Sequence, residues 1–178
     1  MRPDSCSGGG RGPVGTRRWW FALLVVLAAP VVAGCQGTVA DPAGDSEVID
    51  GAVDLVQAGV DYRTATTRFW VRYAPDNGPA AFVTWKVSTD GDTIPGYIVV
   101  VGSGQYVVYR DGNLTDYVCQ GPEPDEPFDG KTELSIDTSC IASPSTGRPS
   151  KSLRISAESH ALRYAEDHTG WTKEIPRS

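Results

Sequence analysis

The sequence predicts an all-β protein whose folded part is an antiparallel β-sandwich of about eight or nine strands with one disulfide. Apolar and polar residues alternate with a period close to two in several short segments, as they do in half-buried strands. The chain's 20 glycines and 13 prolines lie mainly between these segments. No segment has the periodicity of a long amphipathic helix. A closed barrel of lipocalin type is the alternative architecture, because strand number alone does not fix closure.

The strands expected from this pattern share β-branched or aromatic side chains and are bounded by turn residues. In chain order they are residues 53–60, 67–73, 81–87, 97–101, 105–110, 114–119, 131–136, 153–157 and 161–165.

Turn residues suggest how some of these strands pair. Asp-Asn-Gly-Pro at 76–79 predicts a hairpin between 67–73 and 81–87, and Gly-Ser-Gly at 102–104 predicts one between 97–101 and 105–110. The continuous apolar run 97–101 predicts a strand covered on both faces. Residues 120–130 contain three prolines and four acidic residues, which favours an exposed loop.

The first 34 residues are excluded from the domain because they contain the parts of an export signal. Arg17 and Arg18 precede an apolar stretch of fifteen residues that ends at Ala33. A membrane-spanning helix needs about 20 residues, so the stretch is typical of a signal peptide. The arginine pair also resembles a twin-arginine signal, which leaves the export route open.

The sequence Val32-Ala33-Gly34-Cys35 resembles the lipobox of bacterial lipoproteins. The resemblance implies that a diacylglycerol is attached to the sulfur of Cys35 and that residues 1–34 are cleaved. Residues 35–46 would then form the lipidated cysteine and a tether, and residues 47–178 the sandwich. The protein is then expected at the outer face of the cytoplasmic membrane, where the lipid on Cys35 anchors it. An uncleaved anchor with an unmodified Cys35 is the alternative.

The charge of the mature chain argues against nucleic acid as a partner. Cleavage removes four arginines and one aspartate, which lowers the 16 basic residues to 12 and the 22 acidic residues to 21. The formal charge becomes −9, whereas phosphate binding needs basic patches.

Two cysteines remain once Cys6 has left with the leader and Cys35 carries lipid. Cys119 and Cys140 are an even pair in an oxidising compartment, and we expect a disulfide between them. Metal binding by this pair together with the chain's two histidines is the alternative.

Two acidic motifs surround glycines in a way that suits a hard cation. Oxygen ligands at alternate positions can wrap Ca²⁺, and the candidate ligands are Asp41, Asp45, Asp90 and Asp92. The alternative is that these aspartates stabilise turns by bonding to nearby backbone groups. No other cofactor is expected.

The order of several motifs resembles secreted actinobacterial β-sandwich domains and, more distantly, DOMON and carbohydrate-binding module family nine domains. The motifs are Asp-Pro-x-Gly-Asp at 41–45, Asp-Leu-Val at 54–56, Ser-Thr-Asp-Gly-Asp at 88–92 and Gly-Trp-Thr at 170–172. The resemblance implies a sandwich that binds haem or sugar. No residue matches a haem ligand of that group, and the mature chain has no methionine.

Aromatic residues are the remaining candidates for ligand contact. Alternation in 67–73 places Trp70 on one face together with Arg68 and Arg72, so these three are candidate ligand-binding residues. Trp85 lies in an otherwise apolar segment and is expected in the core.

No catalytic motif accompanies them. The chain lacks Gly-x-Ser-x-Gly, His-Glu-x-x-His and a P-loop, so no catalytic residue is assigned and an enzyme is not expected. The sequence predicts a lipid-anchored extracytoplasmic binding module for a cell-wall glycan, a small ligand or an envelope protein. The alternatives are an extracytoplasmic enzyme accessory subunit or hydrolase, and a structural domain that acts only through protein contacts.

Overall fold

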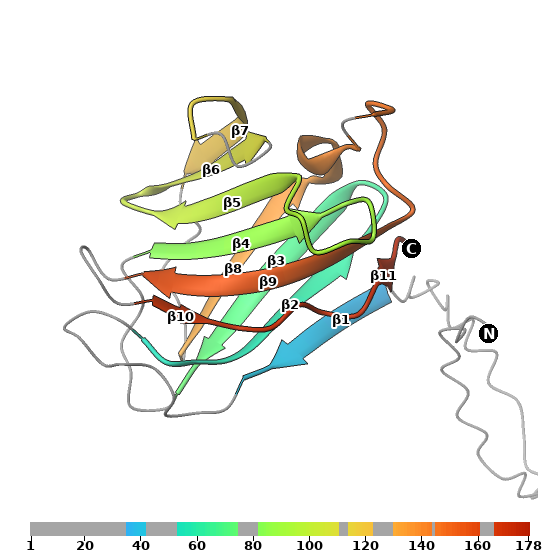
Figure 1. Cartoon of the computed structure of the whole chain (residues 1–178). Helices are drawn as coiled ribbons and strands as arrows, with labels where there is room; N and C mark the ends of the chain where they lie inside the picture. Colours follow the sequence, from blue (N-terminus) through green and yellow to red (C-terminus); the bar gives the residue numbers. More distant parts are fainter. Residues whose placement is uncertain are drawn as a thin grey trace, which may run out of the picture. The chain divides into compact units, whose positions relative to one another are not determined.

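The computed structural model describes residues 35–41, 53–74, 82–110, 114–122, 130–143, 145–160 and 166–178, apart from the side chains of Cys35 and Glu166. The chain divides into two units, Met1–Ala33 and Gly34–Ser178. All described residues belong to the second unit, which is considered by itself (Figure 1).

One sheet has four antiparallel strands in the order β1-β2-β3-β8. Their bounds are Cys35–Ala40 for β1, Leu55–Tyr62 for β2, Thr66–Tyr73 for β3 and Lys131–Asp137 for β8.

The second sheet has seven antiparallel strands, with the main order β10-β9-β4-β5-β6-β7. The short strand β11 pairs with the start of β9, on a different stretch of β9 from β10. The bounds are Phe82–Ser88 for β4, Tyr97–Gly102 for β5, Gln105–Arg110 for β6, Tyr117–Pro122 for β7, Ser152–His160 for β9, Glu166–His168 for β10 and Ile175–Pro176 for β11.

The predicted fold class is confirmed, because the two antiparallel sheets pack face to face as a sandwich (Figure 1). The described residues form eleven strands, compared with the eight or nine expected. Two of the additional strands, β10 and β11, have only three and two residues, too few to show a period of two. The predicted strand at 161–165 lies outside the described residues.

The segment expected to act as a tether begins with strand β1. Cys35 pairs with Tyr62 and Ala40 pairs with Gln57, so β1 forms the edge of the four-stranded sheet. The amide of Asp41 continues this contact with a 3.1 Å bond to the carbonyl oxygen of Val56. The rest of the expected tether, residues 42–46, lies outside the described residues.

The hairpin predicted between 67–73 and 81–87 is wrong. Strand β3 pairs with β2 and β8, whereas β4 pairs with β5 and β9 in the other sheet. Turn residues show where a chain changes direction, but here the connection carries it from one sheet to the other. The predicted hairpin across Gly102 is confirmed, with β5 and β6 paired along their whole length.

The core lies between the inner faces of the two sheets. Trp85 of β4 is fully buried, as expected, and its ring centroid is 5.7 Å from that of Phe69 on β3. Leu55, Val60 and Ile155 add further fully buried side chains. Alternate residues on the same strands point outward, so burial of the inner faces also decides the composition of the outer faces.

The run 97–101 is less covered than expected. Ile98 and Val100 are half-buried on the outer face of the seven-stranded sheet, while Val99 is fully buried on its inner face. No described segment forms a further layer over this outer face. An apolar run therefore predicted the strand correctly but overstated its burial.

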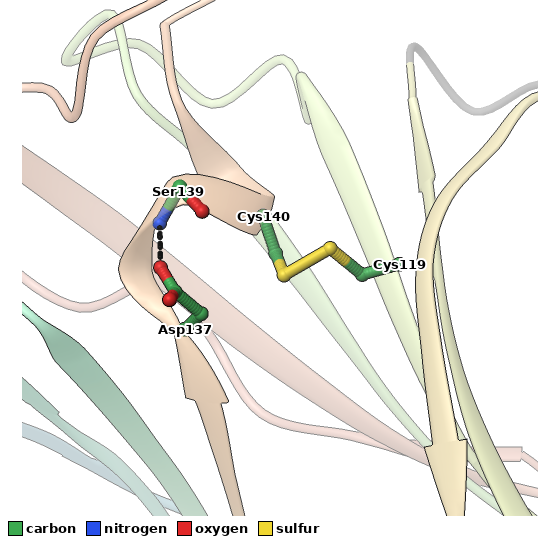
Figure 2. The surroundings of a disulfide bond; sticks show 4 residues. All are labelled: Cys119, Asp137, Ser139 and Cys140. Atoms are coloured by element: carbon green, nitrogen blue, oxygen red, sulfur yellow. Dashed lines mark hydrogen bonds between the residues drawn. A yellow bond between two sulfur atoms is a disulfide. The ribbon is translucent and has the colours of Figure 1, made fainter.

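Each open side of the sandwich has a contact between edge elements of the two sheets. At one side β1 approaches β11, where a Cβ atom on Gly37 would lie 2.1 Å from Cδ1 of Ile175. At the other, the predicted disulfide joins Cys119 of β7 to Cys140, with 5.8 Å between their Cα atoms (Figure 2).

Cys140 lies in the 3₁₀ helix η1, Thr138–Ile141, directly after β8. Asp137 caps this helix, because its Oδ1 accepts a 2.8 Å hydrogen bond from the Ser139 amide (Figure 2). That bond lowers the pKa of the Asp137 carboxyl, since it favours the charged form. The cap thus fixes the turn that presents Cys140 to β7. Among the described residues, no helix is long and apolar enough to cross a membrane.

Removing the disulfide should destabilise the sandwich, because its two cysteines are separated by 21 positions in the sequence. Closing a loop of this length contributes about 3 kcal/mol on the chain-entropy account. We expect the double variant Cys119→Ala/Cys140→Ala to lose about that much free energy of unfolding in urea titrations. A reductant should lower the stability of the parent chain and leave the variant unchanged. Equal stability of parent and variant would contradict a staple between the sheets.

Candidate functional site

Strand β3 directs three polar or aromatic side chains away from the core. Phe69 and Val71 are fully buried, and successive side chains of a strand point to opposite faces. Arg68, Trp70 and Arg72 therefore lie on the outer face of the four-stranded sheet, in the alternation predicted from the sequence.

The strand register determines which residues surround these three. Outward-facing positions of β2 and β8 that pair with them are Gln57, Gly59, Asp61, Lys131, Glu133 and Ser135. These six residues together with Arg68, Trp70 and Arg72 are called the Trp70 face.

Trp70 lies flat against the sheet because its neighbour on β2 has no side chain. Gly59 pairs directly with Trp70, and a Cβ atom built on Gly59 would lie 2.2 Å from Cζ2 of the indole ring. The ring thus occupies the space that any other residue at position 59 would fill. One side of the indole is covered by backbone, and the side chain remains half-buried.

Two cationic side chains lie close to the same ring. The Cζ atom of Arg72 is 5.8 Å from the ring centroid, and the Nζ atom of Lys131 is 5.3 Å from it. Both distances fall within the range of a cation–π interaction. The indole therefore supports two positive charges side by side.

Glu133 is the acidic group at the centre of this arrangement. It pairs directly with Trp70 across the strands, and its Oε2 accepts a 2.8 Å hydrogen bond from Nε of Arg68. Its Oε1 accepts a hydrogen bond from Nζ of Lys131. One carboxylate is thus shared by two cations. Among the described residues Arg72 makes no ion pair.

Crowding of positive charge affects the protonation of Lys131. Partial burial lowers the pKa of its ammonium group, and repulsion from Arg68 and Arg72 lowers it further. Lys131 is a residue of this face that sequence reasoning missed. Lys131 and Glu133 are two positions apart on β8 and share its outer face. Only the pairing of β3 with β8 brings Lys131 close to Trp70.

At the edge of the Trp70 face, Asp61 and Arg63 neutralise each other. The Oδ2 atom of Asp61 lies 2.6 Å from Nη2 of Arg63, and the aspartate is nearly inaccessible to solvent. This pair adds no net charge to the face.

Asp41 of the first acidic motif and the second motif, 88–92, lie at opposite ends of the sandwich. The amide of Asp41 donates a hydrogen bond to the carbonyl of Val56 near the start of β2. Ser159 of β9 lies at the same end, because its hydroxyl donates to the carbonyl of Val53. At the other end, Arg154 contacts the carbonyl of Gly91, between Asp90 and Asp92. Ser159 and Arg154 are five residues apart on β9, about 17 Å at the rise of a strand.

Within the second motif, Asp92 behaves as a turn residue. Its Oδ1 accepts hydrogen bonds from Oγ of Ser88 and from the amide of Ile94. Asp90 is exposed, and Asp45 lies outside the described residues. No three His, Cys, Asp or Glu side chains in the described part of the chain are grouped to hold a metal ion. Ca²⁺ binding by these four aspartates stays a prediction.

Both histidines lie near one glutamate on the outer face of the seven-stranded sheet. Nε2 of His160 is 3.7 Å from Oε2 of Glu158, and His168 pairs with Glu158 across β10 and β9. Oε1 of the same glutamate accepts a hydrogen bond from Nζ of Lys86. The carboxylate beside the two histidines is therefore already engaged by Lys86.

An open hollow lies at the end of the sandwich before β9, lined by Ser143, Thr146, Arg148, Pro149, Ser150 and Lys151. Its hydroxyl groups are engaged within the loop and with the segment that follows β4. Oγ1 of Thr146 accepts a hydrogen bond from the amide of Arg148, and Oγ of Ser150 donates to the carbonyl of Thr89. The hollow is therefore explained by loop structure.

Comparison with known proteins gives no relative: no family model matches the chain, and no curated protein or solved structure is significantly similar to it. The resemblance to DOMON and carbohydrate-binding module family nine domains therefore stays a prediction. The Trp70 face is the described surface whose geometry best suits a ligand.

That geometry depends on Gly59, which gives a direct test. The variant Gly59→Ala should displace the indole and lose about 1 to 3 kcal/mol of stability, as overpacked sites do. In a Trp70→Ala background the same change should cost much less, because no ring competes for the space. A double-mutant cycle from denaturant unfolding measures this coupling. Additive effects of the two substitutions would contradict the close packing of Trp70 on Gly59.

Proposed function

We propose that the chain is a lipid-anchored extracytoplasmic binding module and that the Trp70 face contacts its ligand. The observation that carries the proposal is Trp70 itself, held flat on Gly59 with Arg72 and Lys131 beside its ring. A large aromatic and several charged side chains on an outer sheet face add nothing to core burial. Cross-strand packing that holds these side chains in one arrangement suits the recognition of another molecule.

The proposed anchor is the lipid on Cys35, which rests on the lipobox resemblance. Strand β1 begins at Cys35 and pairs with β2 from its first residue. A lipid at this position would join the four-stranded sheet without an intervening flexible spacer. The module would then work close to the outer face of the cytoplasmic membrane, where cell-wall polymers are accessible.

Replacing Cys35 with serine tests the anchor. A serine has no thiol to receive the diacylglycerol, so we expect Cys35→Ser to accumulate as an unprocessed precursor without lipid. Mass spectrometry of the membrane fraction measures both cleavage and lipid. Cys6→Ser is the matched control, since it also loses a thiol but lies in the segment expected to be cleaved, so the lipid on Cys35 should be kept. Normal maturation of Cys35→Ser would refute the anchor.

A second candidate function is supported by the other sheet. Its outer face carries an apolar strip that consists of Ile98, Val100, Val107, Tyr109 and Tyr117. The first four side chains are half-buried, and Tyr117 has a relative exposure of 59 %. Apolar patches of this kind serve as contacts between proteins. The alternative is therefore a domain that acts through an envelope protein.

Binding to purified cell-wall material separates the two faces. The full-length chain in mild detergent should sediment with the material, and Trp70→Ala should reduce its affinity by at least tenfold, about 1.4 kcal/mol. Tyr109→Ala is the control on the other sheet and should bind as the parent does. Circular dichroism checks that both variants fold. Loss of binding in Tyr109→Ala alone, or no binding by the parent, would overturn the proposed face.

A further inference from the structure

We propose that the ligand of the Trp70 face is a polyanionic glycan, recognised by a pair of cations that Trp70 positions. This inference rests on the proposed function, and it specifies the chemistry of the ligand. It also gives Lys131 a role that the sequence did not indicate.

Positive charge exceeds negative charge on the Trp70 face. Arg68 and Lys131 share the carboxylate of Glu133, whereas Arg72 makes no ion pair among the described residues. The other carboxylate of the face, Asp61, is neutralised by Arg63, so the face carries an excess of positive charge. The mature chain as a whole would carry a formal charge of −9, so this positive region stands out from an acidic protein. Partial burial lowers the pKa of Lys131, and repulsion from Arg68 and Arg72 lowers it further. An anionic group bound beside Arg72 and Lys131 would relieve that repulsion.

The position of the Trp70 indole ring suits it to hold cations. A tryptophan that stacks on a neutral sugar needs one open ring face. Here Gly59 backs the ring, and the two cations lie within 6 Å of its centroid. The ring is therefore placed to hold the cations by cation–π attraction, and the cations meet the ligand. Trp70 acts as a positioning residue.

The two arginines of the face are far apart along β3 and have polar neighbours. Arg68 and Arg72 are four residues apart on one strand, about 13 Å at the rise of β-structure. Two anionic groups of one polymer can therefore contact the face together. Most neighbouring outward positions are polar, namely Gln36, Thr38, Gln57 and Ser135, with Ala40 as the exception.

These polar groups favour a glycan over a lipid surface. Amide and hydroxyl side chains can exchange hydrogen bonds with sugar hydroxyls. A face that docks on a membrane would present protruding apolar side chains, whereas Trp70 lies flat and half-buried. The shared ligand chemistry is a sugar polymer with repeated carboxylate or phosphodiester groups.

Calorimetric titration of the full-length chain in mild detergent tests this. The probes are polygalacturonate, the same polymer with its carboxylates methyl-esterified, and a poly(glycerol phosphate) that separates phosphate from carboxylate as the preferred anion. We expect the esterified polymer to bind at least tenfold more weakly than polygalacturonate. Binding of the anionic polymer should also weaken as salt rises, because surface charges are screened.

Variants identify the residues. Arg72→Gln and Lys131→Gln should each weaken anionic binding by about tenfold, and Trp70→Ala should weaken it although the ring carries no charge. Arg110→Gln and Lys173→Gln remove the same charge from exposed positions outside the face and should bind as the parent does. A loss of affinity in the first two variants but not in the two control variants distinguishes a specific site from general charge attraction.

Other outcomes have distinct meanings. The esterified polymer could bind as tightly as polygalacturonate, independently of salt, and still require Trp70. That result would overturn the polyanion inference and leave the proposed function intact. Preference for phosphatidylglycerol over phosphatidylcholine vesicles that Arg72→Gln abolishes, with neither polymer bound, would replace the glycan by a membrane surface. No Trp70-dependent binding to any polymer or vesicle would refute the proposed function as well.

Discussion

Burial of Phe69 and Val71 between the two sheets is the constraint on which the candidate site depends. A strand places successive side chains on opposite faces, so burying these two forces Arg68, Trp70 and Arg72 outward. A shift of one residue in the register of β3 would exchange the two sets and put charged groups into the core. The hydrophobic effect therefore fixes the outer face of β3 as firmly as its inner face, although no outer residue contributes to the core.

Pairing between strands then turns a row of side chains into a face. On one side of β3, Gly59 leaves room for the indole to lie flat. On the other, β8 supplies Lys131 and Glu133, and Lys131 reaches the same ring as Arg72. The disulfide holds η1, which directly follows β8, to the edge of the opposite sheet. The contacts that close the sandwich thus also support the strand that completes the face.

Local pattern and pairing differ in how far the sequence can predict them. Alternation is a local property, so the strand carrying Trp70 and its outward side chains could be predicted, and the two remaining cysteines indicated the disulfide. The partners of β3 could not be predicted, because β8 follows it by nearly sixty residues and no short motif encodes that pairing. Lys131 was missed for this reason, and the predicted hairpin with β4 was wrong. The small polar residues of β1 predict a tether, because they do not have the alternation that indicates pairing with β2.

Backbone amide resonances of the isotopically labelled chain, followed by NMR during titration with polygalacturonate, test the central claim most directly. The account predicts that shifts concentrate at Gly59, Trp70, Arg72 and Lys131, and that the indole resonance of Trp70 moves with them. Residues of the other outer face, such as Val107 and Tyr109, should stay unchanged. Shifts confined to those residues, with the Trp70 face unaffected, would contradict the account.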